Sequence, residues 1–258
     1  MQLTVMSFNI RYDKPDPGQF NWQSRKGAIA KLINYYAPDI IGTQEGKSHQ
    51  LLDLHRLLPH YGSIGRDRRG TGVDEHCAIF YRNDRLKCGS AGDFWLSETP
   101  EVVGSITPGW GNPYPRIVTW GRFVLSSGSF LFYNTHLDYY GLVAREAGAA
   151  TIRNHFSGLD LTDDYLFLTG DFNANPNTLP RQILAQPLSS GYRLKDLLTE
   201  RDLEAQMTYN GFRDGATMAI DTIYHDSRLQ PVWSKIDSDR WLDVLPSDHY
   251  PVIAEFNI

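Results

Sequence analysis

Short strands and helices alternate over the first 60 residues of the chain, and strands dominate from residue 78 onward. Residues 3–12 and 39–45 combine β-branched, aromatic and other apolar residues, as strands do. Residues 24–38 and 48–59 carry apolar side chains at helical spacing. Later strands are predicted for residues 77–82, 116–125, 129–137, 164–173, 219–225 and 251–258, with a further helix over 142–156. This order predicts an α/β protein with mixed β-sheets covered by helices.

The 258-residue chain is predicted to form a single domain over residues 1–258, because no linker, low-complexity segment or repeat divides it. Its formal net charge of -5 argues against a protein that tracks long nucleic acid. No segment approaches the ~20 apolar residues of a membrane span, and the first residues do not resemble a signal peptide. With only two cysteines and no evident protein partner, we expect a soluble, cytoplasmic protein without a disulfide framework.

Polar side chains recur where the predicted apolar strands end. They are Asn9, Glu45, His136 with Asp138, Asp171 with Asn173, Asp221, and Asp248 with His249. In FLTGDFNANP, residues 167–176, strand alternation would project Asp171 and Asn173 from one face while Phe172 points into the core. Taken alone, this stretch also fits a turn, because Gly, Asp, Asn and Pro end strands. The recurrence at several strand ends favours one shared site, where α/β proteins bind ligands.

The acidic residues at these strand ends predict a divalent cation. If the ends meet at one edge, Glu45, Asp171, Asp221 and Asp248 lie together, and ionised carboxylates repel one another unless a cation lies among them. Sparse oxygen ligands are typical of Mg²⁺ or Mn²⁺ rather than zinc, and the sequence has no HExxH motif and no paired CxxC. A metal ion with an imidazole–carboxylate pair is suited to the attack of water on phosphorus.

Six short stretches follow one another across nearly the whole chain: SFNIR, TQE, NTHLD, TGDFN, IDTIY and SDHYPV. Their residues and order resemble the endonuclease/exonuclease/phosphatase superfamily, which has the DNase I-like fold. FWLSETP and PRIVTW are similar to a bacterial subgroup of that superfamily. The resemblance implies a four-layer α/β sandwich, with two packed mixed β-sheets flanked by helices and the site at one edge.

The resemblance also implies catalytic roles. Asp171 looks like the residue that orients or deprotonates the attacking water, and Asn173 like its partner in phosphate binding. His249, oriented by Asp221, looks like the imidazole that faces the scissile phosphate. His136 looks like the second imidazole of the DNase, sphingomyelinase and deadenylase branches. Whether Asp171 or His249 takes the proton of the water stays open, because such groups titrate together.

Further residues are implied to bind the metal and the phosphate. Glu45 looks like the principal metal ligand, with Asn9 and Asp248 close by. Glu75 has a spacing like that of the glutamate that supports the second histidine in DNase I. Arg116 looks like the arginine that contacts phosphate, which fits the preference of guanidinium for oxyanions. For Glu75 and Arg116, an ordinary surface salt bridge is the alternative.

The superfamily covers nucleases, phosphatases and sphingomyelinases, so the motifs do not fix the substrate. The acidic charge and the aromatic residues of the predicted loops favour a Mg²⁺-dependent phosphoesterase, more specifically a phosphodiesterase, acting on a nucleotide, a short nucleic acid or a similar small phosphorylated molecule. A phospholipid or inositol-phosphate phosphatase, or a sphingomyelinase-like hydrolase, is the alternative. A catalytically inactive binding protein on the same fold is disfavoured, because all the predicted catalytic and metal-binding residues are present.

Two predicted loops have no assigned role. The basic cluster GRDRRG, residues 65–70, is interpreted as a solvated loop rather than a phosphate site. Residues 97–115 are too rich in Pro and Gly for regular structure, and a loop of this length is often functional. Asp138 either lines the site or starts the helix that follows it.

Overall fold

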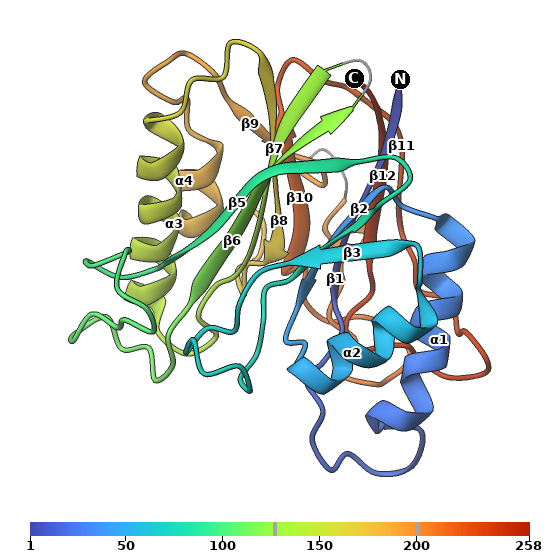
Figure 1. Ribbon diagram of the computed structural model, residues 1–258. Helices are drawn as coiled ribbons and strands as arrows, with labels where there is room; N and C mark the ends of the chain where they lie inside the picture. Colours follow the sequence, from blue (N-terminus) through green and yellow to red (C-terminus); the bar gives the residue numbers. More distant parts are fainter. Residues whose placement is uncertain (126–127, 200–201) are drawn as a thin grey trace.

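The computed structural model describes residues 1–125, 128–199 and 202–258, which contain two six-stranded sheets and four α-helices (Figure 1). The first sheet has the order β11-β12-β1-β2-β4-β3. Its strands are β1 (Gln2–Asn9), β2 (Ile40–Gln44), β3 (Tyr61–Ile64), β4 (Ile79–Arg82), β11 (Pro231–Ile236) and β12 (Val252–Asn257). The second sheet has the order β5-β6-β7-β8-β10-β9. Its strands are β5 (Lys87–Trp95), β6 (Ile117–Leu125), β7 (Gly128–His136), β8 (Asp164–Asp171), β9 (Leu194–Asp196) and β10 (Asp221–Asp226).

The helices cover the two outer faces and complete four layers. Figure 1 shows α1 (Trp22–Tyr36) and α2 (Ser48–Leu57) beside the first sheet, and α3 (Leu142–Ser157) and α4 (Leu179–Ala185) beside the second. One apolar cluster lies between the two sheets, and one more lies beneath each pair of helices. The predicted four-layer α/β sandwich is therefore confirmed. Among the described residues, no helix combines the length and the apolar character that a bilayer crossing requires.

Strand β1 shows how the layers direct polar side chains to one edge. Leu3 and Val5 belong to the cluster between the sheets, whereas Met6 and Phe8 belong to the cluster beneath α1 and α2. Successive side chains of a strand point to opposite faces, so Asn9 shares the inner face with Leu3 and Val5. Both faces of this strand are buried, which explains its nearly continuous apolar sequence. Asn9 is fully buried at the end of the strand, where the two sheets face each other.

Strand pairing brings the predicted site residues to the same level of the sheets. In the first sheet, β1 and β2 are parallel and Asn9 pairs with Gln44. In the second sheet, β7 and β8 are parallel and His136 pairs with Asp171. Strand β10 is antiparallel to β8, so its first residue, Asp221, also pairs with Asp171. The two termini lie side by side at the opposite edge of the sandwich (Figure 1).

The predicted strands and helices are present, and the elements that the sequence did not predict are mostly short or exposed. They are α4, β3, β5, β9 and β11. Strands β5 and β11 are mainly exposed or half-buried, so they lack the apolar alternation that reveals a strand. The segment 97–115 contains no helix or strand, as expected.

Candidate active site

The converging strand ends form a cleft of about 730 Å³ that is lined by both acidic and basic side chains. Of the ten residues predicted for the site, eight line this cleft: Glu45, Glu75, Arg116, His136, Asp171, Asn173, Asp248 and His249. The other two, Asn9 and Asp221, lie behind them and contact residues of the lining. The fold therefore brings the predicted residues to one site.

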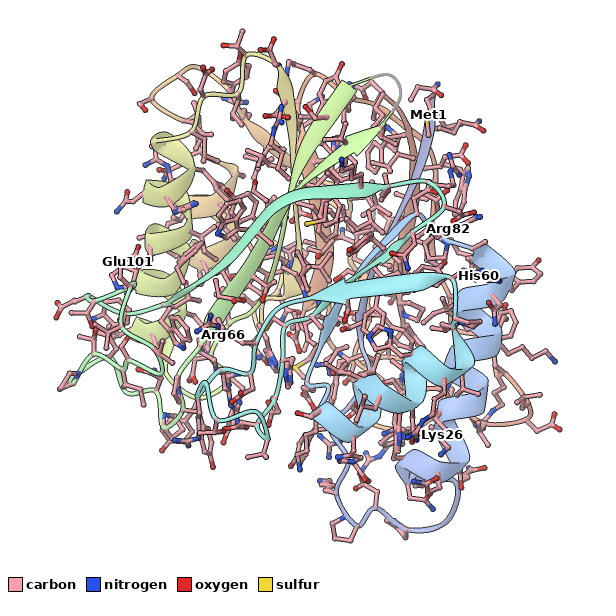
Figure 2. The ribbon with its side chains drawn as sticks, in the orientation of Figure 1. Met1, Lys26, His60, Arg66, Arg82 and Glu101 are labelled. Carbon is pink, nitrogen blue, oxygen red and sulfur yellow. The ribbon has the colours of Figure 1, made fainter. Side chains whose placement is uncertain are left out.

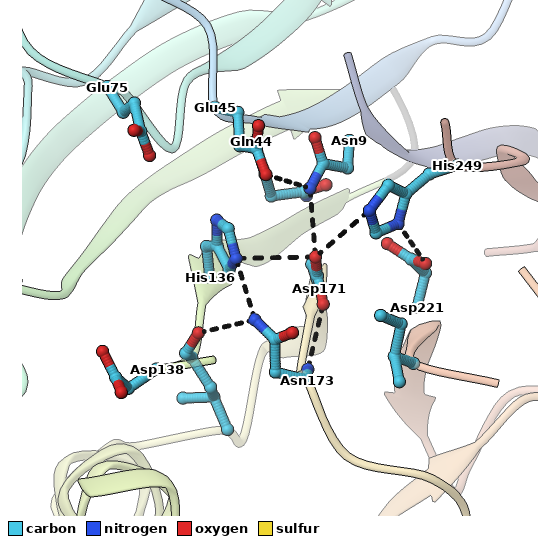
Figure 3. Close-up of polar contacts among 12 residues, drawn as sticks. Asn9, Gln44, Glu45, Glu75, His136, Asp138, Asp171, Asn173, Asp221 and His249 are labelled. Atoms are coloured by element: carbon cyan, nitrogen blue, oxygen red, sulfur yellow. Dashed lines mark hydrogen bonds and ion pairs between the residues drawn. The ribbon is translucent and has the colours of Figure 1, made fainter. Parts of the chain in front are cut away.

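Asp171 is the centre of the site, and three side chains and one backbone N–H group surround its carboxylate (Figure 3). Asn9 Nδ2 donates a hydrogen bond to Asp171 Oδ2 at 3.0 Å, and the backbone N–H of Asn173 donates to Oδ1 at 2.9 Å. The Nε2 atoms of His136 and His249 lie 3.5 and 3.8 Å from Oδ2. Asp171 is therefore held in one orientation by neighbours from both sheets.

Burial and a second acid change the protonation of this centre. Burial, followed by the charge of Asp221, raises the pKa of Asp171 to about 7. A carboxylate with a pKa near the working pH can accept a proton and release it again. Asp171 thus has the properties of a general base near neutral pH.

His249 is held by a buried carboxylate. Its Nδ1 atom lies 2.8 Å from Asp221 Oδ2, and Thr208 Oγ1 donates to the same oxygen at 2.6 Å. Burial lowers the pKa of His249, but the charges of Asp221, Asp171 and Asp248 outweigh it and raise the pKa well above 6.5. His249 therefore carries a positive charge at neutral pH, with Nδ1–H bound to Asp221 and Nε2–H directed toward Asp171.

His136 has the opposite protonation. Asn173 Nδ2 lies 2.9 Å from His136 Nε2 and also donates to the carbonyl oxygen of Leu137. An amide N–H can only donate, so His136 Nε2 accepts and its proton is on Nδ1. Burial and then the charge of Arg116 lower the pKa of His136 well below its usual value, which agrees with a neutral ring. The amide nitrogen of Asn173, predicted to bind phosphate, orients His136 in this structure.

The predicted metal ligands lie beside this centre. Ligand atoms of Glu45, Asp171 and His249 lie within 4.8 Å of one another. Glu45 has the left-handed backbone conformation, φ 68°, which is uncommon for this residue and is typical of functional sites. Asn9 Nδ2 donates to Glu45 Oε1, while Asn9 Oδ1 accepts from the N–H of Arg11. The amide oxygen of Asn9 is thus already hydrogen-bonded, and Asn9 orients two carboxylates.

Asp248 is the remaining predicted ligand. Its carboxylate lies 3.4 Å from Arg11 Nη1 and accepts from Ser247 Oγ at 3.3 Å. Burial, the largest contribution, raises its pKa, and the nearby charge of Glu45 adds to the effect. The buried Arg25 donates to the carbonyl oxygens of Ile10 and Pro246, so it ties the end of β1 to the loop that carries Asp248.

Arg116 and Glu75, for which a surface salt bridge was the alternative, differ in their contacts. Arg116 is buried, lines the cleft and is held by Asp138, whose Oδ2 accepts from Arg116 Nε at 3.1 Å. Asp138 also accepts from two backbone N–H groups before α3, so it both supports the site and caps a turn. The carboxylate of Glu75 instead pairs with Arg68, and within the described ranges it has no hydrogen bond or ion pair with His136. The expected support of His136 by Glu75 is not present here.

Several residues of the site are not among those predicted from the sequence. Arg11, Arg68 and Tyr209 line the cleft, and Thr208 bonds Asp221. Arg68 belongs to the cluster GRDRRG that was interpreted as a solvated loop, and this interpretation is wrong for Arg68, which is 8% exposed. Its flanking basic neighbours are exposed as expected. A single buried arginine among exposed ones has no distinguishing pattern in the sequence.

Comparison with known proteins yields one family and several similar structures. The family model of the Endonuclease/Exonuclease/phosphatase family matches residues 6–249. An endonuclease/exonuclease/phosphatase from Bacteroides vulgatus is 28% identical, with a TM-score of 0.90 over 100% of this chain and 99% of that chain. A mannosyl-6-phosphatase from Bacteroides thetaiotaomicron is 33% identical, with a TM-score of 0.87 over 99% and 100%. The catalytic domain of human Nocturnin, with bound sulfate, is 19% identical, with a TM-score of 0.78 over 99% and 94%, which concerns the fold alone. No curated protein matches the chain.

Proposed function

The chain belongs to the endonuclease/exonuclease/phosphatase family, whose members hydrolyse phosphoester bonds, and from this premise we propose that it cleaves a small phosphate ester with the help of Mg²⁺ or Mn²⁺. One observation carries the proposal. Side-chain atoms of Glu45, Asp171 and His249, from three separate segments, lie within 4.8 Å of one another in a cleft lined by both acidic and basic side chains, so a metal ligand, a base and an imidazole meet at one point. We propose that residues 1–258 form one catalytic domain.

The donor set fits a hard divalent cation. Glu45 lies within 4.8 Å of Asp171, and its charge raises the pKa of Asp248. Burial raises the pKa of both Asp171 and Asp248. A cation among them removes this repulsion, and carboxylate oxygens are the ligands that Mg²⁺ prefers. Glu45 and Asp248 would hold the ion, with Asn9 fixing the Glu45 carboxylate. The ion would supply charge stabilisation at the phosphate oxygens.

The protein residues then divide the proton transfers. Asp171, with a pKa near 7, accepts the proton of the attacking water. His249 is positively charged and donates Nε2–H to an oxygen of the phosphate, while Asp221 holds its Nδ1–H. Arg116, fixed by Asp138, supplies a cation to the developing negative charge. Neutral His136, oriented by Asn173, completes the wall beside the phosphate.

Two substrate classes remain candidates. The similarity to the mannosyl-6-phosphatase of Bacteroides thetaiotaomicron, at 33% identity over almost the whole of both chains, favours a sugar phosphate monoester. A nucleotide or short nucleic acid, the first expectation from the sequence, is the second candidate because four tyrosines line the cleft: Tyr12, Tyr114, Tyr139 and Tyr209. Both candidate substrate classes are small and polar.

The test is phosphate release and product mass spectrometry on a panel of sugar phosphates, nucleotides, single-stranded oligonucleotides and inositol phosphates, with Mg²⁺ or with EDTA. Asp171→Asn keeps the shape of the side chain but removes the base, so kcat is expected to fall at least ~10²-fold. Asp163→Asn, at an exposed position, is the matched control and keeps full activity. Activity that persists in EDTA, or in Asp171→Asn, would refute the proposal.

A further inference from the structure

The loop between β3 and β4, which carries the GRDRRG cluster, forms one wall of the cleft beside Glu45. Asp67 is buried and organises this loop, because its carboxylate accepts from the N–H groups of Arg69, Thr71 and Gly72. Burial raises the pKa of Asp67, but these backbone donors bring it below its ordinary value. The loop is thus fixed by its own buried acid.

This ordered loop presents Arg68 and Glu75 to the cleft as a rigid pair. Arg68 Nη1 and Nη2 donate to the two oxygens of Glu75 at 2.8 and 3.0 Å, and Arg68 Nε lies 3.2 Å from Asp74 Oδ1. The guanidinium stacks on the ring of Tyr114, 4.8 Å from its centroid. Arg68, Asp74, Glu75 and Tyr114 all line the cleft that contains Asp171. Bidentate pairing and stacking fix both side chains before any ligand arrives.

The charge of this pair excludes a second phosphate site. Arg68 lies between the carboxylates of Asp74 and Glu75, and Arg69 Nε lies 2.7 Å from Asp74 Oδ2, so the two positive and two negative charges cancel and both guanidiniums are already paired. Each Glu75 oxygen accepts one N–H from Arg68, and a carboxylate oxygen has a second lone pair for a further donor. Such a surface offers acceptors to hydroxyl groups, and it has no unpaired guanidinium to attract a second anion.

Three of the four tyrosines that line the cleft also argue against a stacked base, because cations lie over their rings. Lys14, Lys47 and Arg11 lie over the ring of Tyr12, at 5.8, 5.0 and 4.9 Å from its centroid. The Tyr114 ring is covered by Arg68 and Arg69, and Arg116 lies 5.7 Å from the Tyr139 centroid. These rings serve as supports for cations.

We infer that Arg68, Asp74 and Glu75 form a subsite that binds the hydroxyl groups of a neutral, polyhydroxylated leaving group, such as a sugar, in preference to a leaving group that carries a second anion. The inference rests on the proposed function, since it places the scissile phosphate at Asp171 and the rest of the substrate against this wall. It assigns Glu75 a role in specificity and identifies a sugar phosphate monoester as the substrate class.

The test compares two sugars that differ by one phosphate group, mannose 6-phosphate and mannose 1,6-bisphosphate, at pH 8 with Mg²⁺. The wild type is expected to prefer the monophosphate. Glu75→Gln removes the charge and one acceptor, so kcat/KM is expected to fall about tenfold for the monophosphate and to rise for the bisphosphate. Glu101→Gln is the matched control, because this exposed residue lies at the outer edge of the molecule (Figure 2) and leaves the preference unchanged.

The opposite signs separate specificity from damage, because a distorted cleft would lower both values together. The inference would be overturned if the ratio of kcat/KM for the monophosphate to kcat/KM for the bisphosphate in Glu75→Gln stayed within threefold of the wild-type ratio. A wild type that prefers the bisphosphate would also overturn it. If the wild type hydrolyses neither sugar, the proposed function fails for this class, and calorimetric Kd values of the two sugar phosphates for wild type and Glu75→Gln decide the subsite by the same ratio.

Discussion

Replacing Asp221 with asparagine tests how the site holds its charged histidine. Asp221 is 1% exposed, and its Oδ2 atom lies 2.8 Å from His249 Nδ1. Asparagine keeps the volume and the hydrogen bond to Thr208, but it removes the negative charge. With an effective dielectric of ~20 and ~4 Å between the charge centres, the lost attraction is about 4 kcal/mol. This is an upper figure, because burial still disfavours the charged imidazole in either protein.

The expected result is a decrease of about 10²- to 10³-fold in kcat/KM, equivalent to ~2.7–4 kcal/mol of transition-state stabilisation. The pKa of His249 is expected to move down toward or below 6.5, since Asp221 is the largest of the contributions that raise it. Phosphate release measures the first effect, and titration of the His249 ring resonances by NMR measures the second. The two must change together if the charge of His249 is what the reaction uses.

Asp221→Asn should also change how the unfolding free energy of the protein depends on pH. A histidine whose folded-state pKa is raised stabilises the fold fully below its unfolded pKa of ~6.5, and this contribution is lost as the pH rises through the folded-state pKa. The difference in unfolding free energy between wild type and Asp221→Asn should therefore be largest below pH ~6.5 and decrease at alkaline pH. Urea unfolding at several pH values measures it.

A control on the same strand makes the result decisive. Asp226 ends β10, is equally buried and pairs with Arg228 at 2.6 Å, far along the strand from the catalytic centre. Asp226→Asn is expected to lower stability while kcat/KM stays within twofold. If Asp221→Asn also kept kcat/KM within threefold, the role assigned to the His249–Asp221 pair would be refuted.

Three further predictions concern the metal, the packing of Gly42 between the two sheets, and the cysteines. EDTA should abolish activity, and Mg²⁺ should restore it. Glu45→Gln should raise the half-saturating Mg²⁺ concentration at least tenfold, and an unchanged metal titration would contradict the role of Glu45 as a ligand. Gly42→Ala should cost about 1–3 kcal/mol in urea unfolding, because its Cβ would lie 2.6 Å from Asn134 Oδ1 and closer still to Thr169 Oγ1; unchanged stability would refute the clash. Burial raises the pKa of Cys77 to about 12, so iodoacetamide at pH 8 should modify the half-buried Cys88 first, as mass spectrometry of the native protein would show.

The fold could be predicted because its determinants are local or repeated. The apolar strands and the helix of residues 142–156 have patterns that appear in any window of the sequence. The ends of these strands carry the polar residues, so the location of the site followed once the strands were assumed to meet. Asp171 and Asp221 illustrate this, since their pairing across β8 and β10 needs only the register of two predicted strands.

The contacts made by individual side chains could not be predicted from the sequence in this way. Glu75 has a spacing that predicts support of a histidine, yet the fold of its loop gives it Arg68 as partner. That choice depends on the buried carboxylate of Asp67, which shapes the loop through backbone hydrogen bonds. No periodicity encodes such a local network, because it depends on which backbone N–H groups the loop turns inward.

Hydrogen bonds of Asn134 with Gln44, Thr43 and Thr169 form a polar seam between the two sheets, and this seam links the fold to the geometry of the site. Asn134 Oδ1 accepts from Gln44 Nε2 at 2.7 Å and from Thr169 Oγ1 at 3.1 Å, and its amide donates to the carbonyl oxygen of Thr43 at 2.8 Å. Gln44 precedes Glu45, and Thr169 lies two residues before Asp171, so the seam fixes the relative height of the strands that carry both acids. A buried amide that loses one of these hydrogen bonds costs free energy, which makes this arrangement specific in a way that apolar packing is not. The position of the proposed metal ligand Glu45 relative to the proposed base Asp171 is therefore set beneath the cleft, by residues that do not line it.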